Sequence, residues 1–151
     1  MLSLLGKVLR ILAGFAVAIV VASTVHVMFV IFPIGLNELI GTDWTKFRTW
    51  LLWIVETSLF YGAFAFLPAA AFIIASEVIS IRSLTYYLLA GLTIAVGGFA
   101  YLARTSAAAP SFVVAFTVAA FLISGIAAGL AYWLISGQFA GVRLSGRKTK
   151  S

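Results

Sequence analysis

Residues 50–76 read WLLWIVETSLFYGAFAFLPAAAFIIAS, and this stretch decides the fold. Its only charged residue is Glu56. A helix needs about 20 mostly apolar residues to cross the hydrocarbon core of a bilayer. In lipid only a helix or a closed barrel satisfies its own backbone hydrogen bonds, and no sustained period-two alternation indicates a barrel. We therefore predict a membrane-spanning helix over residues 50–76.

Three further apolar runs predict spanning helices over residues 11–32, 84–103 and 111–136. Charged residues make up 9% of the 151-residue chain, whereas soluble domains contain about 25%. So few polar residues cannot cover the outside of a soluble fold, which leaves lipid as the surrounding medium. We predict an all-α membrane protein, a single integral domain over residues 1–151 that folds as an antiparallel bundle of four transmembrane helices.

The basic residues predict the orientation of this bundle. Four spans place both termini on one side of the membrane, and basic residues are enriched in cytoplasmic segments. With both termini inside, seven basic residues are cytoplasmic: Lys7, Arg10, Arg82, Arg143, Arg147, Lys148 and Lys150. Only Lys46, Arg48 and Arg104 are then outside. We expect both termini in the cytoplasm, with these seven side chains fixing the topology or contacting lipid headgroups.

Two connecting segments leave alternatives open. In the basic cytoplasmic tail (137–151), the segment GVRLSGRKTKS (141–151) is either attracted to anionic lipid, at about 1 kcal/mol for each basic residue, or simply solvated, and the second reading is favoured. In the loop over residues 33–49, four apolar residues are consistent with a short interfacial helix or with an ordinary loop: Ile34, Leu36, Leu39 and Ile40.

Small residues recur at helical spacing in the predicted spans. Because lipid provides no hydrophobic drive for helices to associate, close packing of small residues matters. The stripes are Gly14, Ala18, Ala22 and His26 in the first span, Glu56, Ala63, Ala70 and Glu77 in the second, and Gly125 and Gly129 in the fourth. We expect these faces to pack inside the bundle, although the glycine pair suits a contact with another subunit equally well.

Glu56 and His26 are the candidate polar pair within the membrane. Glu56 lies six residues after Trp50, about 9 Å along a helix, and His26 lies at a similar depth in the first span. A carboxylate facing lipid is costly. Glu56 has three ways to avoid this cost, which are pairing with His26, pairing with Arg104, or taking up a proton. Glu77 and Arg82, which flank the second connection, are expected to form a surface pair or to contact headgroups.

The residue inventory narrows the possible chemistry. The chain has no cysteine and one histidine, so thiolate metal sites, disulfides and bis-histidine haem within the chain are excluded. No nucleophile lies beside a base in a recognisable catalytic pattern, and no nucleic-acid-binding motif accompanies the basic residues. We expect no enzymatic activity, no cofactor, no metal site and no nucleic-acid partner.

The segments ASEVISIRSLTYYLLAG (75–91) and GLAYWLISGQFAG (129–141) resemble small four-span inner-membrane proteins of alphaproteobacteria. The resemblance covers the second half of the chain. It implies the same hairpin topology and a bacterial inner membrane, and it assigns no activity and no functional residue.

Small-residue faces and few intramembrane polar groups favour a non-enzymatic role. We expect an accessory or assembly subunit of a larger membrane complex, or a homo-oligomeric structural protein. Its partners are then the lipid bilayer together with other membrane subunits or copies of itself. The alternative is a small proton-coupled transporter or channel that uses Glu56 and His26.

Overall fold

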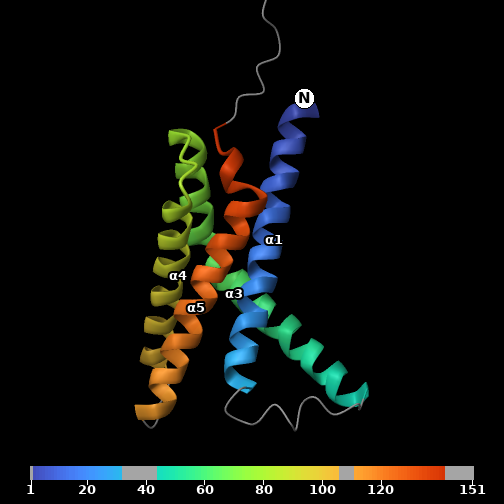
Figure 1. Cartoon of the computed structure of the whole chain (residues 1–151), viewed down its shortest axis with the longest axis vertical. Coiled ribbons are helices and arrows are strands. Elements are labelled where there is room, and N and C mark those ends of the chain that lie inside the picture. The colour runs from blue at the N-terminus through green and yellow to red at the C-terminus, as the bar shows by residue number, and fades with distance from the viewer. Residues whose placement is uncertain (1, 32–43, 106–110, 142–151) are drawn as a thin grey trace, which may run out of the picture.

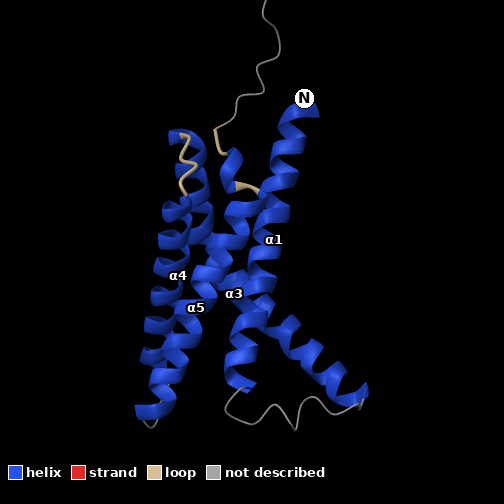
Figure 2. Cartoon of the chain, in the orientation of Figure 1, coloured by secondary structure: helices blue, strands red, loops and turns tan. Residues whose placement is uncertain are grey.

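The computed structural model describes residues 2–31, 44–105 and 111–141. Four long helices account for most of these residues: α1 (Leu2–Ile31), α3 (Trp44–Ile79), α4 (Leu84–Thr105) and α5 (Ser111–Ile135). A short 3-10 helix, η2 (Gly137–Phe139), follows α5. All regular structure in the described residues is helical (Figures 1 and 2).

Each of the four long helices is long and apolar enough to cross a membrane. The apolar spans are Leu5–Phe29, Phe47–Ile79, Leu84–Arg104 and Ala115–Ile135. Four such spans indicate a multi-pass membrane protein.

The first two helices are longer than the sequence predicted. α1 begins at Leu2 rather than near residue 11, and α3 begins at Trp44 and ends at Ile79 rather than covering residues 50–76. Residues 44–49, which the sequence places in the connecting segment 33–49, thus belong to α3. Charged residues mark the end of an apolar run, but they do not end a helix, which continues into the headgroup region. The predicted interfacial helix around Ile34 and Leu39 lies outside the described residues.

α5 packs between α1 and α4, and its contact with α4 depends on glycine. A Cβ atom on Gly125 would lie 2.6 Å from Cβ of Ala95, and one on Gly129 would overlap the backbone of Tyr87. Only glycine allows the two backbones to approach this closely. The Gly125 and Gly129 face thus contacts α4 within the chain.

α1 contributes the small side chains of its stripe to the interior. Gly14, Ala18 and Ala22 are buried, and a Cβ atom on Gly14 would lie 3.1 Å from Cβ of Ser136 on the α5 side. Three buried serines donate to carbonyls of their own helix, as Ser23 does to Ile19 at 2.9 Å; the other two are Ser76 and Ser124. These three hydroxyls are therefore satisfied without a partner from another helix.

α3 crosses the other helices at a steep angle, and its first half departs from them, as the teal segment in Figure 1 shows. The seven-residue spacing predicted that Glu56 and Ala63 face the interior, but both are exposed, whereas Ala70 is half-buried. The prediction assumed a helix that stays in contact along its whole length. A crossing helix instead keeps its contact near the crossing point and loses it toward its N-terminal end.

Candidate functional site

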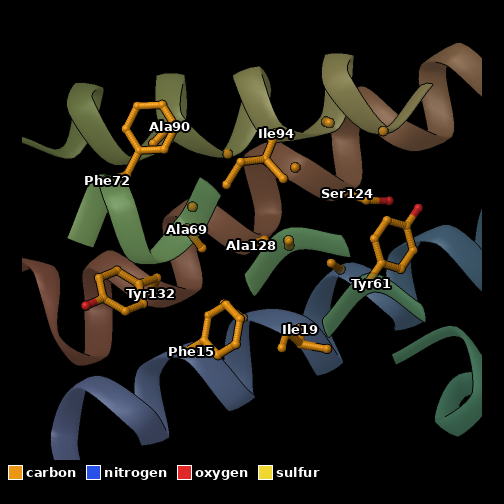
Figure 3. Close-up of a pocket in the computed structure, with 18 of the residues that line it drawn as sticks. Phe15, Ile19, Tyr61, Ala69, Phe72, Ala90, Ile94, Ser124, Ala128 and Tyr132 are labelled. Atoms are coloured by element: carbon orange, nitrogen blue, oxygen red, sulfur yellow. The ribbon is translucent and has the colours of Figure 1, made fainter. Parts of the chain in front are cut away.

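A central cavity of about 110 Å³ lies where α3 crosses the other three helices (Figure 3). Small side chains such as Ala69, Ala90 and Ala128 form much of its wall, and Phe15, Ile19, Phe72 and Ile94 border it. The hydroxyl of Ser124, which also lines the cavity, donates to the carbonyl of Ala120. An apolar cavity of this kind suits an apolar occupant and does not suit water.

His26 and Tyr61 join α1 and α3 at one end of the central cavity. The Tyr61 hydroxyl lies 2.8 Å from His26 Nδ1, and the ring of Tyr61 lines the cavity. The ring of Phe121 packs against both, with centroid distances of 5.0 Å to His26 and 5.8 Å to Tyr61. The sequence identified His26 but missed Tyr61, which does not lie on the small-residue stripe.

Glu56 borders a second depression, here called the Glu56 cleft, on the far side of Tyr61 from the central cavity. The cleft measures about 350 Å³. Its lining residues are His26, Val27, Trp53, Glu56, Thr57, Phe60, Tyr61, Leu102, Thr117 and Phe121. Glu56 and His26 thus share one cleft, as their similar predicted depth suggested. Their direct pairing is absent among the described residues, because His26 bonds to Tyr61 instead.

The carboxylate of Glu56 makes no hydrogen bond or ion pair with any residue that the structure describes. Glu56 is exposed on the first half of α3, where the cleft separates it from residues of α1, α4 and α5. Arg104, the third member of the predicted polar group, is exposed near the end of α4. Neither it nor His26 forms an ion pair with Glu56 in the described part of the chain.

A polar cluster at the opposite end holds the helix ends together. Lys7 Nζ on α1 forms an ion pair with Glu77 on α3 at 2.5 Å, and the amide of Gly141 donates to Glu77 at 3.0 Å. Arg82 Nε donates to the carbonyl of Ala140 at 3.0 Å, and Trp133 Nε1 donates to the carbonyl of Arg82 at 2.9 Å. The start of α1, the end of α3 and the end of α5 therefore meet at one place.

This cluster bears on two expectations. Glu77 pairs with Lys7, and a pair with Arg82 is absent among the described residues, because α1 comes close to the end of α3, a proximity that spacing along one helix cannot reveal. At the start of the tail, Ala140 is 1% exposed and the amide of Gly141 donates to Glu77. Residues 142–151, with Arg143, Arg147, Lys148 and Lys150, lie outside the described residues.

Arg10 is the least satisfied cation of this end. Its Nε is buried and has no hydrogen-bond partner among the described residues. Its guanidinium carbon lies 4.7 Å from the centroid of the Phe139 ring, within the range of a cation–π contact.

The described residues contain no group of three histidine, cysteine or acidic side chains placed to hold a metal ion. The ionisable side chains of the Glu56 cleft are the carboxylate of Glu56, the imidazole of His26 and the phenol of Tyr61. Comparisons of the chain with family models, with curated proteins and with solved structures find no match.

Proposed function

We propose that the chain is a non-enzymatic subunit of a membrane assembly, which it joins through the first half of α3. The assembly is either a larger complex, in which the chain is an accessory subunit, or a homo-oligomer. The observation that carries this proposal is the exposed carboxylate of Glu56, which has no partner in the described residues.

The cost of that carboxylate is the physical argument. An ionised acidic side chain costs about 2.5–3.5 kcal/mol at the centre of a lipid-facing helix on insertion scales, and less away from the centre. A basic or hydrogen-bonding group on a neighbouring subunit removes this cost. Lipid cannot remove this cost, because its hydrocarbon region has no hydrogen-bond donors.

The surroundings of Glu56 are consistent with a contact surface. Trp53, Leu59 and Phe60 flank it and are exposed by 45%, 70% and 54%. These residues lie on the half of α3 that makes least contact with the rest of the chain (Figure 1). Tryptophan is among the residues enriched at the energetically important centres of protein interfaces.

The location we propose is a bacterial inner membrane, with the four spans antiparallel and both termini in the cytoplasm. The excess of basic residues at the Lys7 and Arg82 end supports this orientation. The resemblance of residues 75–91 and 129–141 to alphaproteobacterial inner-membrane proteins supports the location.

Native mass spectrometry tests the proposal. The protein is extracted in mild detergent from the membrane of the cells that naturally produce it. We expect a mass above that of one chain, and we expect Glu56→Gln to reduce the assembled fraction. Glu77→Gln is the matched control, since it makes the same change on the same helix inside the Lys7 cluster. It should leave the assembled fraction unchanged. A wild-type chain that is monomeric throughout would overturn the proposal.

A second candidate function is a proton or cation pathway, and the shared cleft favours it. Glu56 and His26 border the same 350 Å³ cleft, and histidine titrates near neutral pH. This function predicts proton flux in vesicles that contain the purified chain, with flux lost in Glu56→Gln while the folded protein is retained. Flux by the single purified chain would favour this candidate over the assembly subunit.

A further inference from the structure

The seam between α1 and α3 carries a lateral groove of about 320 Å³. Its lining residues are Ile11, Leu12, Phe15, Phe66, Ala70, Ile73, Ile74, Glu77 and Val78. All of them except Glu77 are apolar. Leu12, Ile74 and Val78 are exposed by 54%, 63% and 77%, so the groove opens on the outer surface of the helices.

The shape of the groove suits one extended hydrocarbon chain. It extends along α3 from Glu77 to Phe66, which are eleven residues apart, or about 16 Å along a helix. The rings of Phe15 and Phe66 meet edge to face at 6.1 Å at the end away from Glu77. Phe15 and Ile73 also border the central cavity and thus separate it from the groove.

The polar end of the groove carries an excess of positive charge. Lys7 lies beside Glu77 at this end, and Arg10 follows it by one turn of α1. Residues three apart are neighbours on a helix surface, so both cations are within reach of one headgroup. With Arg82, the described residues of this end have three cations and a single carboxylate, Glu77.

We propose that the lateral groove binds an anionic phospholipid, with one acyl chain along the groove and the phosphate beside Lys7 and Arg10. Arg10 is only partly buried, and its guanidinium makes no hydrogen bond with the described residues; a phosphate oxygen is a strong acceptor for such a group. The bilayer supplies acyl chains at this depth, and the positive charge selects an anionic headgroup. The site lies at the opposite end of α3 from Glu56, so it does not depend on the proposed assembly.

Native mass spectrometry in mixed micelles tests this site, with phosphatidylglycerol and phosphatidylcholine of identical acyl chains as the probes. We expect wild-type protein to retain phosphatidylglycerol preferentially. Removing one cation near the surface weakens attraction to an anionic lipid by about 1 kcal/mol, so Arg10→Gln should reduce the preference about fivefold. Arg104→Gln is the matched control at the other end of the molecule and should retain the preference for phosphatidylglycerol. Arg10→Lys should also retain most of this preference, because it keeps the positive charge. This variant separates loss of charge from loss of fold.

A second pair of variants tests the groove itself. Ala70→Phe places a ring in the groove and should reduce retention of both lipids. Ala71→Phe makes the same change on the exposed neighbour, which does not line the groove, and should have no effect. Equal retention of the two lipids by wild-type protein would overturn the headgroup assignment. Equal behaviour of the two phenylalanine variants would overturn the groove.

Discussion

The hydroxyl of Tyr61 lies 2.8 Å from Nδ1 of His26, and this hydrogen bond joins α3 to α1 where the central cavity ends. On the far side of the pair, the Glu56 cleft begins, and α3 leaves the other helices (Figure 1). The pair therefore marks the boundary between the packed part of α3 and the part that we assign to assembly.

Tyr61→Phe should lower the free energy of unfolding by about 1 kcal/mol, the usual net contribution of one hydrogen bond. The phenyl ring retains the packing against Phe121, so little else changes. Denaturant unfolding in detergent measures the effect. A double-mutant cycle with His26→Asn isolates the pair, and additive effects of the two changes would show that the bond contributes nothing.

The α4–α5 contact should be intolerant of any side chain at Gly125. A Cβ atom there would lie 2.6 Å from Cβ of Ala95 and would also overlap the backbone oxygen of Gly91. Gly125→Ala should therefore destabilise the protein by about 1–3 kcal/mol, the typical cost of overpacking. Thermal unfolding in detergent measures this change.

Gly97→Ala is the control for that substitution. A Cβ atom on Gly97 would meet nothing within 4 Å, and alanine is favoured over glycine in a helix interior by about 1 kcal/mol. We expect Gly97→Ala to be neutral or stabilising. If both alanine variants were equally destabilised, the close approach of α4 and α5 would not be the cause of the effect at Gly125.

Much of the architecture could be predicted from the sequence because lipid imposes a strong constraint. Four apolar runs of sufficient length imply four helices, and the predicted bounds of α4 and α5 differ from the observed ones by at most two residues. The predicted start of α1 and both predicted ends of α3 lie too far inward, because hydropathy detects the hydrocarbon core and not the helix. The steep crossing of α3 was missed, since it depends on how three other helices pack.

The candidate site was predictable in its residues but not in its pairing. Glu56 and His26 stand out as polar residues within apolar runs, and they do border one cleft. Their partners depend on which side chains of different helices meet. Tyr61 lies off the small-residue stripes, so no spacing pattern singles it out. Lys7 and Glu77 each looked like a residue at the end of a span, and only the approach of α1 to α3 makes them a pair.

Glu77→Gln should loosen the junction of the helix ends. The change removes the charge that pairs with Lys7 and weakens the acceptor of the Gly141 amide. Since the two side chains retain 28% and 15% exposure, we expect a loss of only about 1 kcal/mol. Hydrogen exchange should report the change locally, as faster exchange at Gly141 with little change at Ala95 in the packed part of α4. Unchanged exchange at Gly141 would contradict the role of Glu77 as the acceptor.

Filling the central cavity should stabilise the protein. Ala69 faces the cavity of about 110 Å³ (Figure 3), and the cost of an empty cavity is about 24 cal/mol for each Å³. Ala69→Leu adds three carbon atoms where neighbours already surround the space. We expect a gain of about 1 kcal/mol, because the larger side chain also loses rotamer freedom. Ala71→Leu adds the same atoms on the exposed face of α3 and should change the stability little. Thermal unfolding of the two variants compares them directly, and a loss of stability confined to Ala69→Leu would mean that the cavity is too narrow or already occupied.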